Sequence, residues 1–152
     1  MSDTTGNTVT IMFACRQNAG RSQMTAAVAK SLASDNIQIL SAGSDPADEV
    51  HPVVVEALAS IGLKPDSQPK QLKRENVQIS DWVITMGCGE SCPYVPGVHY
   101  EDWDIADPHG KNLDEVKVIL SQITEKVRDL LERVTEQQPG SDAKYLKRPV
   151  LK

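Results

Sequence analysis

Aromatic residues are scarce in this chain of 152 residues, which has one phenylalanine, two tryptophans and three tyrosines. Six aromatic side chains cannot fill a core, so the core must be mostly aliphatic, and the length suits one domain without staples. No apolar run approaches the roughly 20 residues of a membrane span, and the first residues lack the basic-then-apolar pattern of a secretion signal. We therefore expect a cytoplasmic protein with no membrane partner.

An excess of positive charge is also missing. Sixteen lysines and arginines face 21 aspartates and glutamates, which gives a formal net charge of −5. Proteins that bind nucleic acids by neutralising phosphates are normally basic. A nucleic-acid partner is therefore not expected.

Cysteine is the third scarce residue, with only Cys15, Cys88 and Cys92. An odd and sparse set is a poor disulfide framework for a secreted domain. Cys88 and Cys92, with His99 and His109 as distant additions, give no standard zinc spacing, so no metal site is predicted. Chemical reactivity is the better explanation for these thiols.

Strand and helix patterns alternate along the chain. The last helix is the clearest, because Asn112 and Glu115 form a capping-box-like start and an apolar face follows from Val116 to Val134. The residues at 41–46 read as a turn cluster. The predicted strands lie at residues 8–14, 37–40, 82–86 and 98–100, and the other helices at 23–34 and 52–61.

This order predicts a single α/β domain with a central parallel sheet of about four strands and helices on both faces. We place the domain at residues 1–136. Residues 137–152 form a polar tail with a basic end from Lys144, which we interpret as solvated and mobile.

The first strand runs into a short polar segment, residues 15–22, which we call the cysteine loop. Such a loop at a helix N-terminus points backbone N–H groups inward and suits an oxyanion. Arg21 can close the ring with its planar fork, and the same field favours the thiolate of Cys15. Ser22 is placed to donate a hydrogen bond to this thiolate. The other predicted oxyanion-binding residues are Arg16, Gln17, Asn18, Ala19 and Gly20.

Two of these residues are expected to shape the loop. Gly20 allows the backbone to turn where a side chain would collide with the ligand. Asn18 can hold the loop by hydrogen bonds from its side chain to the backbone. A bare Cys-x5-Arg pattern also occurs by chance, and Cys15 alone would read as a small buried residue ending a strand. The preceding strand and following helix favour the oxyanion site.

A thiolate that displaces oxygen from an oxyanion benefits from a proton donor for the leaving group. Asp107 is the best candidate, because Pro108 and Gly110 favour a fixed turn before the last helix. Asp102 and Asp104 remain rivals, and an ordinary Asp-Pro turn is the simpler explanation without the cysteine loop.

Cys88 and Cys92 follow the predicted strand at residues 82–86, whose carboxyl end faces the same sheet edge as the cysteine loop. They can be a metal pair, inert thiols, or resolving thiols that take over a disulfide and pass it outward. Glycines on both sides of Cys88 favour a segment able to move. We therefore favour the third possibility, a thiol–disulfide relay through Cys88 and Cys92.

At this point the residues match a known family. The segment FACRQNAGRSQM at residues 13–24 resembles the active-site loop of arsenate reductases built on the low-molecular-weight tyrosine phosphatase fold. Ser41-Ala42-Gly43 and Asp107-Pro108 also resemble that family. The phosphatases proper usually carry a second cysteine before the loop arginine and Ser-Pro after it, where this chain has Gly20 and Ser22-Gln23.

The resemblance implies a mechanism. Cys15 attacks arsenate, and Asp107 protonates the departing oxygen. Cys88 then attacks Cys15, so that arsenite leaves and a Cys15–Cys88 disulfide forms. Cys92 attacks next and leaves a Cys88–Cys92 disulfide for thioredoxin, with no bound cofactor. The best-known three-cysteine members space the last two cysteines more widely, so a low-molecular-weight thiol with a glutaredoxin-like partner is an alternative reductant.

Two other functions compete with arsenate reduction. The same loop binds phosphate, so the protein can be a phosphomonoesterase of the low-molecular-weight tyrosine phosphatase type. It can also be a non-enzymatic oxyanion-binding or redox-sensing protein. The phosphatase would not need Cys88, whereas the sensor would not need Asp107.

Overall fold

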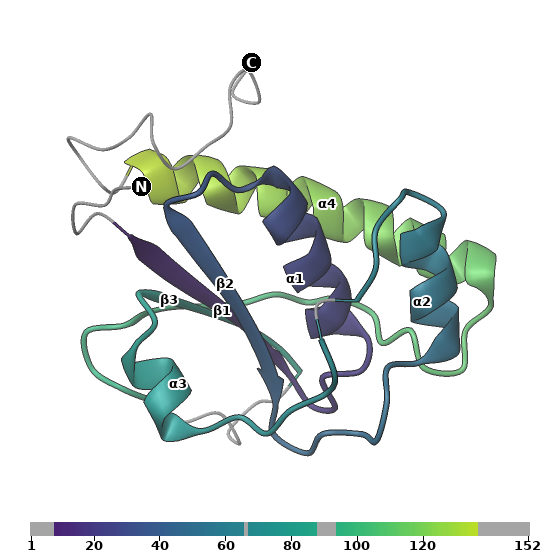
Figure 1. Ribbon diagram of the computed structural model, residues 1–152, viewed down its shortest axis with the longest axis horizontal. Helices are drawn as coiled ribbons and strands as arrows, with labels where there is room; N and C mark the ends of the chain where they lie inside the picture. The colour runs from purple at the N-terminus through teal and green to yellow at the C-terminus, as the bar shows by residue number, and fades with distance from the viewer. Residues whose placement is uncertain (1–7, 66, 88–93, 137–152) are drawn as a thin grey trace.

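The computed structural model describes residues 8–65, 67–87 and 94–136. It contains a sheet of four strands in the order β2-β1-β3-β4, with every neighbouring pair parallel. Helices cover both faces, so the predicted fold class is confirmed (Figure 1). The strands are β1 (Val9–Cys15), β2 (Ile37–Gly43), β3 (Trp82–Met86) and β4 (His99–Asp102), and the helices are α1 (Arg21–Leu32), α2 (Pro52–Ala59), α3 (Arg74–Gln78) and α4 (Leu113–Glu136).

The two faces of β1 divide the core. All seven residues of this strand are buried, because it lies between β2 and β3 with helices on both sides. Ile11 and Phe13 belong to the large cluster under α1, α2 and α4, whereas Met12 packs with Val77 of α3 and Val83 of β3 on the opposite face. Because successive side chains of a strand point to opposite faces of the sheet, β1 contributes residues to the core on both faces.

The helices follow the predicted pattern, except that one short helix was not predicted. The apolar face of α4 is buried as expected, and Asn112 and Glu115 exchange the two capping-box hydrogen bonds, at 2.9 and 3.0 Å. Helix α1 is instead buried on every side from Ser22 to Ala29, since the sheet, α4 and α2 surround it. The prediction missed α3, which is five residues long and buries only Val77.

The prediction for β2 was wrong at its end. Residues 41–43 continue the strand instead of turning, because they pair in register with Phe13, Ala14 and Cys15 of β1. Smaller shifts occur elsewhere: α1 begins at Arg21 instead of residue 23, and α2 ends at Ala59 instead of residue 61. The predicted tail at residues 137–152 lies outside the described residues.

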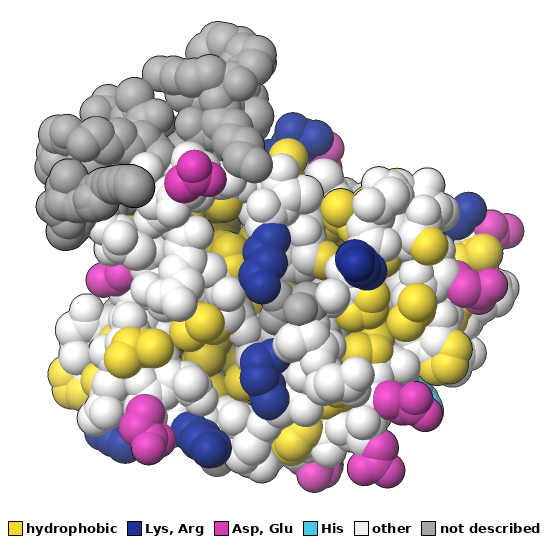
Figure 2. Space-filling view, in the orientation of Figure 1, with side chains coloured by type: hydrophobic (Ala, Val, Ile, Leu, Met, Phe, Trp, Pro, Cys, Tyr) yellow, Lys and Arg dark blue, Asp and Glu magenta, His cyan; other side chains and the backbone are white. Residues whose placement is uncertain are grey.

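On the face shown in Figure 2, lysines and arginines are scattered among acidic, neutral and apolar side chains. None of the helices in the described ranges is long and apolar enough to cross a membrane.

A charged clamp joins the last strand to the last helix. Glu101 of β4 accepts hydrogen bonds from the Arg133 guanidinium of α4 and, at 2.9 Å, from the indole N–H of Trp103. The bond from Arg133 lowers the pKa of Glu101 below its ordinary value of 4.5, although burial opposes the shift. Arg133 also contacts Asp129, one turn earlier on the same helix.

We predict that Glu101→Gln lowers the free energy of unfolding at pH 7 by about 1.5–3 kcal/mol, the range for hydrogen bonds to charged groups. Because the folded-state pKa of Glu101 is depressed, its stabilisation is present above the unfolded-state value of 4.5 and is lost as pH falls below it. The difference between the variant and the native protein should therefore shrink in acid, as measured by urea unfolding from pH 7 to pH 3.5.

Asp129→Asn is the matched control, because Asp129 is 66% exposed and binds the same arginine. An exposed helix pair contributes only about 0.3–0.5 kcal/mol. An equal loss in the two variants would contradict the special role of Glu101.

Candidate active site

The cysteine loop joins the carboxyl end of β1 to the N-terminus of α1, between the ends of β2 and β3. Ligands of open α/β sheets bind outside the carboxyl ends of the strands, at the point where the strand order reverses. In this sheet that point lies beside β1, which has β2 on one side and β3 on the other. Cys15 is the last residue of β1 and pairs with Gly43 on one side and Met86 on the other.

The backbone carbonyls of the loop point away from the pocket. Those of Cys15, Arg16, Gln17 and Ala19 accept hydrogen bonds of 2.7–3.2 Å from N–H groups in the segment 44–51 that follows β2. Among the described residues, no hydrogen bond uses the N–H groups of residues 16–21 as donors. These amides are free to bind an anion at the helix N-terminus, which agrees with the predicted cradle.

Asn18 and Ser22 form a buried hydrogen-bond chain that leads to Cys15. The Oδ1 of Asn18 accepts the backbone N–H of Lys70 at 3.0 Å, so its Nδ2 points to Ser22 and donates to Oγ at 2.7 Å. Ser22 Oγ lies 2.9 Å from Cys15 Sγ and uses one of its two lone pairs for Asn18. This distance suits the predicted hydrogen bond from Ser22 to a Cys15 thiolate, and the donation itself stays a prediction. Asn18 has a φ of 51°, a left-handed conformation that asparagine tolerates well.

Gln23 extends this network, and the sequence analysis missed it. Its side chain is completely buried, and its Nε2 donates to the backbone oxygen of Asn18 at 3.0 Å. Its Oε1 accepts the N–H of Ser67 at 3.2 Å. A glutamine in the first turn of a buried helix is the only signal in the sequence, and it does not reveal which segment it contacts.

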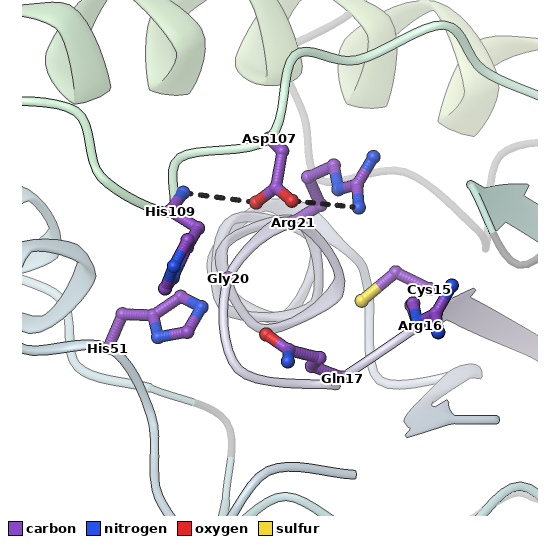
Figure 3. A pocket seen from close by; sticks show the side chains of 8 residues that line it. All are labelled: Cys15, Arg16, Gln17, Gly20, Arg21, His51, Asp107 and His109. Atoms are coloured by element: carbon purple, nitrogen blue, oxygen red, sulfur yellow. Dashed lines mark hydrogen bonds and ion pairs between the residues drawn. The ribbon is translucent and has the colours of Figure 1, made fainter. Parts of the chain in front are cut away.

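Arg21 and Asp107 meet at the edge of the pocket. The guanidinium of Arg21 lies 3.6 Å from Asp107 Oδ2, and its side chain is only 16% exposed. Asp107 Oδ1 accepts the N–H of His109 at 3.0 Å, so the predicted Asp-Pro turn holds this carboxyl (Figure 3). The rivals Asp102 and Asp104 do not line the pocket.

Two glycines allow close approaches. A Cβ on Gly20 would lie 2.6 Å from Cγ of Pro108, so a side chain there would meet the Asp107 turn, and the predicted collision with a ligand stays a prediction. A Cβ on Gly43 would lie 2.7 Å from the Arg16 carbonyl oxygen. Both glycines therefore let separate segments pack tightly against the cysteine loop.

The pocket has a volume of about 130 Å³ and is lined by Cys15, Arg16, Gln17, Gly20, Arg21, His51, Asp107 and His109. It thus brings together five residues of the predicted loop and the predicted acid. Asn18, Ala19 and Ser22 are buried in the loop behind it.

The two histidines had no predicted role in the site. His51 precedes Pro52 at the start of α2, and its position after β2, at the ligand-binding edge of the sheet, is a signal that could have identified it. Partial burial lowers the pKa of His51 from its ordinary value of 6.5, His109 lowers it further, and Asp107 opposes the shift.

Cys88 and Cys92 lie outside the described residues, so their predicted roles stay predictions. The preceding residues are described: Met86 pairs with Cys15, and Gly87 packs so closely on Arg21 that a Cβ would lie 2.7 Å from Nη1. The chain therefore reaches the pocket edge one residue before Cys88. Among the residues that the structure describes, no group of three or more potential metal ligands is present.

This chain is similar to known proteins in sequence and in fold. Residues 10–139 match the family of low molecular weight phosphotyrosine protein phosphatases. A putative arsenate reductase of Halobacterium salinarum is 35% identical over 126 residues, which cover 79% of this chain and 89% of the relative. The glutaredoxin arsenate reductase of Synechocystis is 30% identical over 129 residues, which cover 82% of this chain and 98% of the relative.

The structure of a thioredoxin-dependent arsenate reductase from Corynebacterium glutamicum superimposes with a TM-score of 0.78 at 36% identity. The match covers 89% of this chain and 66% of that one. An arsenate reductase from Archaeoglobus fulgidus gives a TM-score of 0.70 at 30% identity, covering 79% of this chain and 97% of that one. The resemblance of the cysteine loop is therefore confirmed, and the chain belongs to the low molecular weight phosphotyrosine protein phosphatase family.

Proposed function

We propose that this protein reduces arsenate to arsenite, with Cys15 as the nucleophile and an external thiol system as the source of electrons. The observation that carries the proposal is the Cys15 sulfur in a pocket lined by the cysteine loop and Arg21, with the Ser22 hydroxyl 2.9 Å from it. The names of the relatives from Halobacterium and Synechocystis support arsenate as the oxyanion.

The first step is substitution at arsenic. The free N–H groups of residues 16–21 and the Arg21 guanidinium bind the oxygens of arsenate and stabilise the charge that develops on them. The Cys15 thiolate forms a sulfur–arsenic bond while one arsenic–oxygen bond breaks. Asp107 gives its proton to the departing oxygen, which leaves as water, and arsenic remains in the +5 state.

Reduction follows in a second step on sulfur. The Cys88 thiolate attacks Cys15 Sγ, so that a disulfide forms and the sulfur–arsenic bond breaks with its electron pair moving to arsenic. Arsenic is thereby reduced to +3 and leaves as arsenite. Cys92 then attacks Cys88, which releases Cys15 and leaves a disulfide that an external dithiol reduces with two electrons.

Thioredoxin is the reductant that we propose, because the structurally similar protein from Corynebacterium glutamicum is thioredoxin-dependent. The relative from Synechocystis is named for glutaredoxin. The assay is therefore run with thioredoxin, its reductase and NADPH, and in parallel with glutathione and glutaredoxin.

Cys15→Ser should abolish arsenate reduction, because a serine hydroxyl is a far weaker nucleophile than a thiolate and cannot form the disulfide with Cys88. The variant should still bind phosphate, since the loop amides and Arg21 are unchanged. Arsenite release measured over many turnovers, beside phosphate binding by calorimetry, tests this expectation. Measurable arsenate reduction by Cys15→Ser would end the proposal.

Asp107→Asn should lower kcat by roughly 10²–10⁴, the usual contribution of a positioned general acid. Asp102→Asn and Asp104→Asn are matched controls, because neither side chain lines the pocket, and both should remain close to the native rate. Steady-state arsenate reduction separates the three variants. A loss confined to Asp102→Asn or Asp104→Asn would move the acid to that residue.

The relay predicts different end points for the two remaining cysteines. Cys88→Ser should release no arsenite, because nothing attacks Cys15, whereas Cys92→Ser should release one arsenite per chain and stop as a Cys15–Cys88 disulfide. Rapid-quench arsenite measurement and mass spectrometry of the protein follow these states.

The phosphatase alternative makes the opposite prediction, since hydrolysis of p-nitrophenyl phosphate does not need Cys88. If Cys88→Ser and Cys92→Ser both kept full multiple-turnover arsenate reduction, the relay would be wrong. If the native protein hydrolysed the ester efficiently and did not reduce arsenate, phosphatase activity would replace the proposed function.

A further inference from the structure

Two imidazole rings form the wall of the pocket opposite the nucleophile. Figure 3 shows Cys15 on one side of the pocket and His51 and His109 on the other, with Asp107 between them at the edge. The two ring centroids are 5.2 Å apart, and the ring planes are inclined by 53°. His51 comes from the start of α2 and His109 from the turn before α4.

Backbone N–H groups tie His51 to the cysteine loop and His109 to Asp107, which contacts Arg21 of that loop. The N–H of His51 donates to the Ala19 carbonyl at 3.0 Å, and the N–H of His109 donates to Asp107 at 3.0 Å. Gly20 lies between these attachments, where an added Cβ would be 3.4 Å from the His51 ring and 2.6 Å from Pro108. The wall therefore has a fixed position relative to Cys15.

The position of this wall matters because of the direction of substitution. In an in-line displacement the leaving group departs on the side opposite the attacking atom. A group leaving from an oxyanion bound to the loop therefore moves away from Cys15 Sγ, toward Asp107 and the two imidazoles. The substituent on that oxygen is a proton in a free oxyanion and a carbon group in an ester.

The space on this side is small. The pocket holds about 130 Å³, whereas sites for drug-sized organic ligands hold about 300–1,000 Å³. A tetrahedral ion fits such a volume, whereas an aryl group on the leaving oxygen would extend toward the two rings. His51 also remains mostly neutral at pH 7, since burial and His109 both disfavour its charged form.

We propose that His51 and His109 are specificity-determining residues, which restrict the site to free tetrahedral oxyanions and exclude monoesters by occupying the space of the ester group. This inference rests on the proposed function, because it defines the substrate class of the same pocket. Specificity of this type is a difference between two affinities, so its test must compare a free ion with an organic analogue.

The test measures protection of Cys15 from alkylation, which needs no turnover. The full chain with Cys88→Ser and Cys92→Ser leaves Cys15 as its one thiol. The rate of iodoacetamide modification is followed with inorganic phosphate or with phenylphosphonate, which cannot be hydrolysed. We expect phosphate to protect at concentrations at least about tenfold lower than phenylphosphonate.

Adding His51→Ala and His109→Ala should reduce this preference about tenfold or more, through better protection by phenylphosphonate. His51→Gln with His109→Gln retains bulk and should keep more of the preference. His99→Ala is the matched control, because His99 is the remaining histidine of the chain and stacks on Trp82, outside the pocket. Circular dichroism and thermal melting verify that each variant folds.

Three results would overturn the inference: an unchanged preference in the double alanine variant, weaker protection by phenylphosphonate, or loss of protection by phosphate. The second would mean that the rings bind aryl groups, and the third that they bind the anion. Because alkylation is independent of arsenate chemistry, a native protein that reduced no arsenate would refute the proposed function while this comparison still gave its own answer.

Discussion

The site depends on the contact between the end of β2 and the backbone of the cysteine loop. A side chain on Gly43 would meet the carbonyl oxygen of Arg16 and the amide nitrogen of Asn18 at less than 3 Å. With glycine there, the segment 44–51 lies against the loop and its N–H groups take up the loop carbonyls. Because the carbonyl groups of the loop accept hydrogen bonds on its outer side, its N–H groups face the opposite side. The predicted anion cradle follows from this packing.

Contacts with a distant segment also orient the side chains beside Cys15. The backbone N–H of Lys70 fixes the oxygen of Asn18, and the amide nitrogen of Asn18 then donates to the Ser22 oxygen. Ser22 keeps its hydrogen and a second lone pair, so the direction of its hydrogen bond with Cys15 depends on whether the sulfur carries a proton. A segment 52 residues from Asn18 thus orients a side chain inside the eight-residue loop.

This dependence explains how much the sequence could predict. Local patterns were sufficient for the parallel α/β fold, the cysteine loop and the capped α4, because each is encoded by neighbouring residues. The end of β2 was missed since Ser41, Ala42 and Gly43 have turn-forming composition, and only pairing with β1 makes them a strand. Helix α3 was missed because one buried valine gives no helical period.

The site residues also differ in whether neighbouring residues or distant ones place them in the site. Cys15, Arg21 and Ser22 share one segment, and their spacing already carries the chemistry. Gln23, His51 and His109 were missed because their contacts with Ser67, Ala19 and each other join segments that are distant in sequence. The packing of Pro108 on Gly20 joins distant segments in the same way.

The two sides of the pocket have different physical tasks. The Cys15 side is an environment of amides, a hydroxyl and a guanidinium, which suits any tetrahedral oxyanion, so we do not expect it by itself to distinguish arsenate from phosphate. In the proposed mechanism, selection comes from what happens after binding: what can leave on the side of Asp107 and the histidines, and whether a second thiol reaches the sulfur. Arg21 lies 3.6 Å from Asp107 and packs against Gly87, the residue before Cys88, so one cation lies between the proposed acid and the end of the strand that precedes the proposed second thiol.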